Sequence, residues 1–132
     1  AVIPIFCKAF LDEGKITING DGDTSRDFTF VDNAVYLNDL ALFTKNEEAL
    51  NQVYNAACGD QVSLNEMVKM LRQFSNGNPE VQYGPERKGD VRHSKANISK
   101  AEGLLLYKPK VRFAQGLKQV YQWYMENNIK EL

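Results

Sequence analysis

The sequence predicts an α/β fold in one domain. Strand-like runs alternate along the chain with segments whose apolar residues recur every three or four positions, which is typical of amphipathic helices. The 132 residues are 43% hydrophobic and 25% charged, the composition of an ordinary globular domain. A chain of this length forms one sizeable core and not two, so we interpret residues 1–132 as a single domain.

Three short runs in the first half predict strands, because their side chains alternate or are rich in apolar residues. These runs are residues 15–18, 27–31 and 52–57. Residues 19–23 (NGDGD) predict a turn, since Asn, Asp and Gly tolerate positive φ. One helix is predicted at the start, with apolar residues at positions 2, 6 and 10. Another extends to Phe43, with Asp32 as its candidate N-cap.

Capping signals predict two helices in the second half. In each, a serine is followed three residues later by a glutamate, so that the two side chains can bond each other's backbone N–H groups. The two segments are residues 63–66 (SLNE) and 99–102 (SKAE). Residues 81–83 predict a short strand. The apolar spacing after Phe113 predicts a final helix.

The charge balance and the cysteine count exclude several classes of protein. The chain has 16 Lys and Arg against 17 Asp and Glu, so we expect neither nucleic acid nor an anionic membrane as a partner. No apolar run approaches the ~20 residues that a membrane-spanning helix needs. Cys7 and Cys58 form neither a disulfide framework nor a metal-ligand spacing, so no metal site is expected. These features predict a reduced, cytoplasmic protein.

Two loops hold arginines that are suited to binding an anion. Arg26 follows the Gly-Asp-Gly turn, and Arg87 precedes Gly89 and Asp90 in the charged segment 84–94. A guanidinium group offers parallel donors to a phosphate, and a nearby carboxylate accepts hydrogen bonds from sugar hydroxyls. A solvated loop with local ion pairs is the alternative interpretation of the same residues.

Four stretches resemble the C-terminal part of extended short-chain dehydrogenase/reductases, within the NAD-dependent nucleotide-sugar epimerases and dehydratases. They are INGDGDTSRDFTFVDN, VYNAACGDQVSLNE, GPERKGDVRHSKANISKAEGLLLYKPKV and FAQGLKQVYQWY. The RDF run together with GDVRHS is most similar to bacterial UDP-hexose and UDP-N-acetylhexosamine 4-epimerases. The resemblance extends from about Val2 to Tyr124. It implies a small mixed α/β substrate-binding portion that lacks the N-terminal Rossmann half.

The resemblance also implies roles for five residues. Thr17 and Asn19 match the segment that lines the uracil, largely through backbone groups. Arg26 and Arg87 match the two arginines that contact the diphosphate, and Asp90 matches the aspartate that binds the ribose hydroxyls. Two arginines suit a pyrophosphate, which has about two negative charges. We therefore expect weak binding of a UDP-sugar.

The cofactor loop and the proton-transfer pair of this family are not found in the sequence. The family binds NAD with a Gly-rich loop and uses a Tyr-xxx-Lys pair, whereas the chain contains neither G-x-G-x-x-G nor Tyr-xxx-Lys. We therefore expect no cofactor in this chain, no catalytic residue and no epimerisation by the chain alone. The chain is then interpreted as part of a longer enzyme or as a truncated product.

One further departure from the family is local. Leu106 stands where the family often has Gly, and if it ends a helix in the left-handed conformation it costs about 1 kcal/mol.

Other functions are compatible with the same residues. The chain could be a non-catalytic interaction or small-ligand module that reuses the fold. Within the enzyme interpretation, a 4,6-dehydratase or a decarboxylase is the alternative. If residues 52–57 form a strand with an open edge, that edge favours pairing between copies. This predicts a homo-oligomer.

Overall fold

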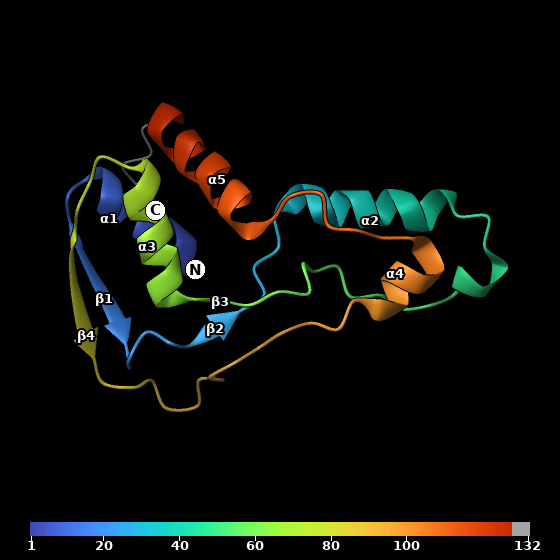
Figure 1. Cartoon of the computed structure of the whole chain (residues 1–132), viewed down its shortest axis with the longest axis horizontal. Helices are drawn as coiled ribbons and strands as arrows, with labels where there is room; N and C mark the ends of the chain where they lie inside the picture. The colour runs from blue at the N-terminus through green and yellow to red at the C-terminus, as the bar shows by residue number, and fades with distance from the viewer. Residues whose placement is uncertain (128–132) are drawn as a thin grey trace.

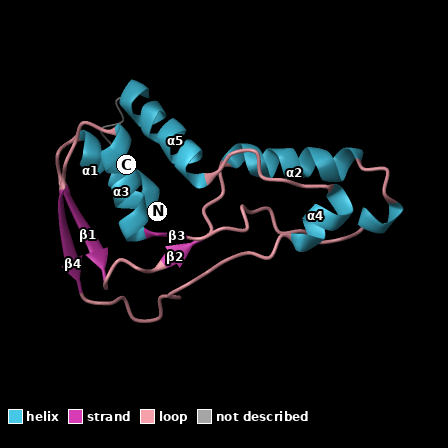
Figure 2. Ribbon diagram, in the orientation of Figure 1, coloured by secondary structure: helices cyan, strands magenta, loops and turns pink. Residues whose placement is uncertain are grey.

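The computed structural model describes residues 1–127, whose elements form a larger and a smaller lobe (Figure 1). The larger lobe contains α1 (Val2–Leu11), β1 (Lys15–Asn19), β2 (Ser25–Arg26), β3 (Val62–Ser63), α3 (Leu64–Phe74), β4 (Glu80–Gly84) and α5 (Phe113–Asn127). The smaller lobe contains α2 (Val31–Phe43), the 3₁₀ helix η1 (Glu47–Ala49) and α4 (Ser99–Leu105). Long loops join the two lobes (Figure 2). Helices and strands interleave along the chain, so the α/β prediction is confirmed.

The strands form two small sheets. β1 pairs in parallel with β4, with Ile16 opposite Val81 and Asn19 opposite Gly84. β2 pairs antiparallel with β3. Because β1 and β4 run in the same direction, both end at the same edge, and the segments that follow them leave the sheet together (Figure 2).

The larger lobe is held by a core between β1 and three helices. Ile16 and Ile18 point from β1 into this core, while the alternate residues of the strand are exposed. The helices contribute large buried side chains: Phe6 and Phe10 from α1, Met67 and Leu71 from α3, Leu117 and Tyr121 from α5. Each fully buried side chain of this size contributes about 1.5–3 kcal/mol. This core fixes the position of the sheet edge.

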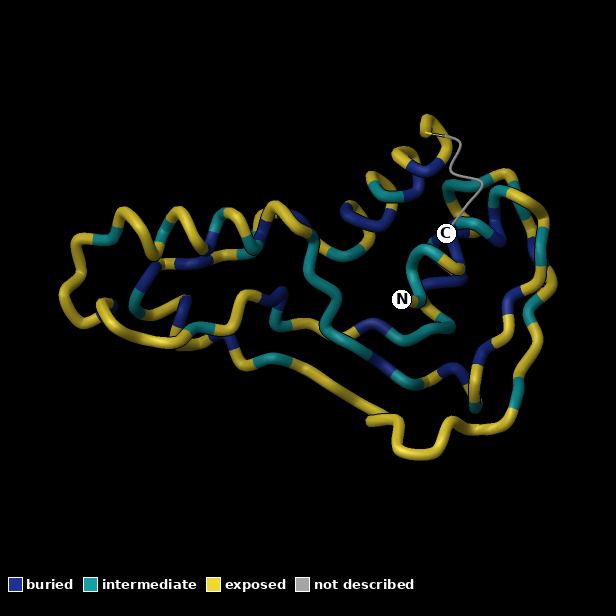
Figure 3. Tube along the Cα trace, turned by 180° about the vertical axis from the view of Figure 1, so that it is seen from behind, coloured by how far each residue is buried: buried dark blue, intermediate teal, exposed yellow. Residues whose placement is uncertain are grey.

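A second core holds the smaller lobe. Leu37 of α2 and Leu105 of α4 are buried there with Tyr107, whose hydroxyl donates a 2.9 Å hydrogen bond to the carbonyl of Ala57. The side of α2 that faces away from α4 is exposed along most of its length (Figure 3). Among residues 1–127, no helix is both long enough and apolar enough to cross a membrane.

The strand predicted at residues 27–31 is wrong. β2 ends at Arg26, and the Asp27 carboxylate accepts hydrogen bonds from the N–H groups of Cys58 (3.0 Å), Gly59 (2.9 Å) and Ala96 (3.3 Å). The chain therefore leaves the sheet here and connects the two lobes. In this segment Asp27 bonds the backbone of the smaller lobe at Ala96, whereas the Phe28 ring packs against Phe113 of the larger lobe, with 5.1 Å between the ring centroids and a 35° tilt.

The strand predicted at residues 52–57 is also wrong, since this segment is irregular. The Tyr54 hydroxyl bonds the Ala49 carbonyl at 2.8 Å, and Asn55 donates to the Asn97 carbonyl at 3.0 Å. Side chains rather than a backbone ladder hold this segment against the smaller lobe.

The predicted N-cap is confirmed for one helix and is wrong for two others. Ser63 and Glu66 form the predicted capping box of α3. The box predicted at Ser99 is absent, because α4 begins one residue earlier and Asn97 accepts the Ser99 N–H instead (2.9 Å). Asp32 lies inside the first turn of α2 and does not cap it, since the N-cap position is Phe30. For α2 and α4, short polar residues near the helix start thus indicated the helix but not its first residue.

Candidate functional site

The five predicted site residues lie on segments that meet at the C-terminal edge of the β1–β4 sheet. Thr17 and Asn19 occupy the exposed face of β1, opposite the residues that point into the core. Arg26 lies on β2, directly after the turn that follows β1. Arg87 and Asp90 lie in the loop that follows β4. Ligand sites in open α/β sheets form at this edge, where the connecting segments diverge.

An ion pair brings two of these residues together. One Nη atom of Arg26 is 2.5 Å from an Asp90 carboxylate oxygen. The other Nη donates to the backbone carbonyls of Ser25 (2.8 Å) and Arg92 (3.4 Å). Backbone groups therefore fix the guanidinium plane. The side chains of Arg26 and Asp90 are 30% and 43% exposed, so a ligand can reach both.

Backbone pairing holds the loop after β4 against β2. The Ser25 N–H donates to the Arg92 carbonyl (2.9 Å), and the Ser94 N–H donates to the Ser25 carbonyl (3.1 Å). The Ser25 hydroxyl also lies 2.9 Å from Nδ1 of His93. Gly89 has φ +84° with open space around it, which lets the loop bend just before Asp90. The base of this loop is thus anchored and its tip is exposed.

Arg87 is placed near Asp90 only through the backbone. The Asp90 N–H donates to the Arg87 carbonyl at 3.1 Å. Within residues 1–127 the exposed Arg87 side chain makes no hydrogen bond or ion pair. The structure therefore joins Arg26 to Asp90 and leaves the Arg87 guanidinium group apart from them.

Asp21 and Arg92 were missed by the sequence analysis. The Asp21 carboxylate accepts the Asp23 N–H (3.0 Å) and pairs with the Arg92 guanidinium group. The Asp23 amide, followed by Arg92, lowers the pKa of Asp21. Arg92 also lies 3.5 Å from Glu86. These contacts tie the turn after β1 to the loop after β4, and only their tertiary placement identifies them.

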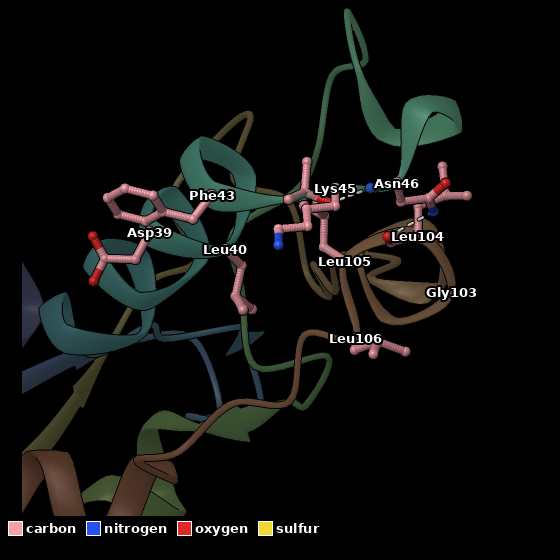
Figure 4. Close-up of a pocket in the computed structure, with 10 residues that line it drawn as sticks. Asp39, Leu40, Phe43, Lys45, Asn46, Gly103, Leu104, Leu105 and Leu106 are labelled. Carbon is pink, nitrogen blue, oxygen red and sulfur yellow. Dashed lines mark hydrogen bonds between the residues drawn. The ribbon is translucent and has the colours of Figure 1, made fainter.

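A separate open pocket of about 560 Å³ lies between the C-terminal end of α2 and α4 (Figure 4). Leu40 and Phe43 approach it from α2, and Leu104 and Leu106 from the α4 end. Asn46 closes one side by donating to the Leu104 carbonyl at 3.1 Å. None of the five predicted site residues lines this pocket, whose lining combines leucines and Phe43 with the polar side chains of Asp39, Thr44, Lys45 and Asn46.

Comparison with known proteins agrees with this fold. Residues 1–57 match the NAD dependent epimerase/dehydratase family. The crystal structure of UDP-glucose 4-epimerase from Thermotoga maritima with UDP-glucose superimposes on 97% of the chain with a TM-score of 0.87 and 33% identity. Over nearly its whole length the chain is therefore similar to enzymes of the nucleotide-sugar epimerase and dehydratase type.

Two further proteins that are similar to the chain have different activities. UDP-glucuronic acid 4-epimerase from Bacillus cereus, in complex with UDP-glucuronic acid and NAD, is 29% identical over 96% of the chain, with a TM-score of 0.87. The UDP-N-acetyl-alpha-D-glucosaminuronate decarboxylase of Bacillus cytotoxicus is 26% identical over 95% of the chain. The chain spans about 40% of the length of each of these three proteins.

The described residues do not fit NAD. A dinucleotide pyrophosphate binds at a helix N-terminus that directly follows a strand and a Gly-rich turn. The turn at Gly20–Gly22 leads into β2 instead of a helix. The space beside Gly22 is filled, because an added Cβ there would lie 2.2 Å from the Asn65 side-chain oxygen. No reaction step is therefore assigned to NAD in this chain.

Proposed function

We propose that the chain binds a UDP-sugar at the edge where β1 and β4 end, as the substrate-binding portion of a nucleotide-sugar 4-epimerase. The observation that supports this most strongly is the contact between Arg26 and Asp90, which are 64 positions apart in the sequence. The site lies in the cytoplasm in this proposal, and UDP-sugar binding is weak because other parts of the longer relatives do not contribute.

The chemistry of binding follows from the donors and acceptors at this edge. Arg26 is held by backbone carbonyls and presents its remaining N–H groups to the diphosphate. Arg87 has a side chain with no competing partner among the described residues and closes on the other phosphate. Asp90 exchanges Arg26 for the ribose hydroxyls, an exchange that costs little because exposed ion pairs contribute only about 0–1 kcal/mol.

The uracil in this proposal lies along β1. Thr17 and Asn19 expose their side of the strand, and base recognition there uses backbone groups. Since all five residues are at least partly exposed, the ligand is covered on one side only. A Kd on the order of 1 mM is expected for such a half-covered site.

We propose that the chain alone does not epimerise a sugar. It contains no Tyr-xxx-Lys pair, and its described residues do not fit NAD. A decarboxylase substrate is the second candidate, favoured by the match to the decarboxylase of Bacillus cytotoxicus over 95% of the chain. Both candidates share the uridine diphosphate group, which is the part that these residues recognise.

We also propose that the chain associates with itself. The open edge predicted at residues 52–57 does not support this, because that segment is not a strand. The β1–β4 sheet has only two strands, so each strand has an edge without a partner strand among the described residues. α2 exposes Val31, Val35 and Leu42. Open strand edges and apolar helix faces favour contact between copies. Light scattering that gives a monomer of 15.0 kDa at high concentration would contradict self-association.

Arg26→Gln tests the binding proposal. Loss of the charged fork weakens binding of UDP about tenfold or more, since a charge-assisted hydrogen bond contributes about 1.5–3 kcal/mol. Saturation-transfer NMR measures this against Arg72→Gln, which removes an exposed arginine from the far end of α3. Equal UDP affinity in the two variants would contradict the role of Arg26.

A further inference from the structure

The turn between β1 and β2 is held in place from α3. The side-chain amide of Asn65 donates to the Asp21 carbonyl and to the Asp23 carboxylate, both at 3.0 Å. The backbone N–H of Asn65 donates to the Gly22 carbonyl at 3.1 Å. One residue thus bonds three successive positions of the turn.

Tyr83 holds Asn65 in the orientation that these contacts need. The Tyr83 hydroxyl donates to the Asn65 side-chain oxygen at 2.9 Å. The Asp21 carbonyl accepts hydrogen bonds only, so the NH₂ group of Asn65 must face the turn and its oxygen must face Tyr83. Every polar atom of the Asn65 side chain therefore has a partner, and a flipped amide would lose both of its bonds to the turn.

The turn is shaped to fit Asn65. Gly22 has φ +80°, and a Cβ atom at this position would lie 2.2 Å from the Asn65 oxygen. Any side chain at Gly22 would therefore displace Asn65 as well as strain the backbone. The Asn65 amide can occupy its position only because residue 22 has no side chain.

The turn joins the two ends of the proposed ligand site. Asn19, on the uracil side, comes immediately before it, and Arg26, on the diphosphate side, lies just beyond it. The position of the turn therefore sets the spacing between these two groups. We propose that Asn65 and Tyr83 are positioning residues for nucleotide binding, acting through the turn without touching the ligand. This inference depends on the proposed function.

Tyr83→Phe tests the inference, because it removes one hydroxyl from a side chain that is 58% exposed and leaves the ring in place. Tyr54→Phe is the matched control, since that hydroxyl bonds the Ala49 carbonyl in the smaller lobe. UDP binding is followed by ¹⁵N-resolved NMR titration for both variants. Tyr83→Phe weakens UDP binding roughly threefold to tenfold, the effect of losing one neutral hydrogen bond, with a melting temperature equal to that of the control.

A second readout separates this inference from the proposed function. In Tyr83→Phe and in Asn65→Ala, the backbone amides of Asp21 and Asp23 show lower heteronuclear NOE values than in the wild-type chain, with or without UDP. If wild-type chain does not bind UDP but the NOE values fall, the proposed function is wrong and Asn65 still orders the turn. Unchanged NOE values, or equal UDP affinity in Tyr83→Phe and Tyr54→Phe, would overturn the inference.

Discussion

Leu106 has a strained backbone at the end of α4. It adopts φ 55° and ψ 30°, the left-handed conformation that glycine occupies at many helix ends. The side chain is 77% exposed, so it gains little from packing. The leucine at this position, where similar sequences often have glycine, therefore has a conformational cost in the folded chain.

Replacing Leu106 with glycine stabilises the chain. Leu106→Gly removes the clash of Cβ with the backbone and raises the free energy of unfolding by about 0.5–1 kcal/mol, after the added flexibility of the unfolded chain is subtracted. Urea unfolding measures the change. Leu106→Ala keeps a Cβ and serves as the control, so equal stability of the glycine and alanine variants would contradict the strain.

Asn33 joins the two lobes through a buried amide. Its side chain is 0% exposed, and its NH₂ group donates to the Val111 carbonyl at 2.7 Å. Its oxygen accepts the N–H groups of Lys110 (2.9 Å) and Val111 (3.0 Å). The segment before α5 is therefore attached to α2 by one side chain.

Asn33→Leu destabilises the chain strongly. It keeps the branched shape of the side chain but leaves the Lys110 and Val111 N–H groups without partners and the Val111 carbonyl with only the Cys58 thiol, at a cost of about 3 kcal/mol in the free energy of unfolding. Asn38→Leu is the control on the same helix, because Asn38 is exposed and donates only to the Ala34 carbonyl. Chemical denaturation measures the free energy of unfolding of both variants. A similar decrease in Asn33→Leu and Asn38→Leu would contradict the prediction.

Cys7 links stability to alkaline pH. Burial in the core of the larger lobe raises the pKa of the Cys7 thiol to about 11. The folded chain therefore keeps this proton while the unfolded chain loses it from about pH 9, so stability falls as the pH rises from about 9 to 11. Urea unfolding across this range measures the fall. Cys7→Ala has a smaller slope with pH, and an equal slope in both proteins would contradict this assignment.

Gly77 packs directly against the backbone of α1. Gly77 lies in the connection from α3 to β4, and an added Cβ would come within 1.9 Å of the Phe10 carbonyl oxygen in α1. Backbone atoms cannot move aside as a flexible side chain can. The connection can pass the end of α1 only because position 77 has no side chain.

Gly77→Ala therefore separates α1 from the connection and lowers the free energy of unfolding by about 2 kcal/mol or more, the range of overpacked sites. Gly103→Ala is the opposite case, since Gly103 lies in α4 with no atom within 4 Å of an added Cβ. There alanine stabilises the helix by roughly 0.5–1 kcal/mol. Thermal unfolding compares the two, and the same sign for both would refute the packing at Gly77.

Helices were easier to predict than strands in this chain. The α3 capping box depends on residues three apart, so Ser63 and Glu66 identified it locally. The alternation at residues 27–31 is also local, but Asp27 bonds Cys58, Gly59 and Ala96, and those partners are supplied by the tertiary fold. Periodicity cannot distinguish a strand from an extended connector that packs on both sides.

At the scale of the whole molecule, the site combines predictable and unpredictable residues. The family resemblance identified Arg26 and Asp90, which the structure joins by an ion pair. Asn65 and Tyr83 could not be identified in this way, because their bond joins the start of α3 to the end of β4. Arg87 was identified by the same resemblance, and the structure leaves its side chain apart from the pair.

UDP titration of the ¹⁵N-labelled chain tests the proposed site most directly. Binding at the end of the β1–β4 sheet predicts amide shifts at Thr17, Asn19, Arg26, Arg87 and Asp90. Residues around the α2–α4 pocket, such as Phe43 and Leu106, would keep their shifts. Saturating UDP that leaves the first group unshifted, or that shifts only the pocket residues, would contradict a nucleotide site at this edge.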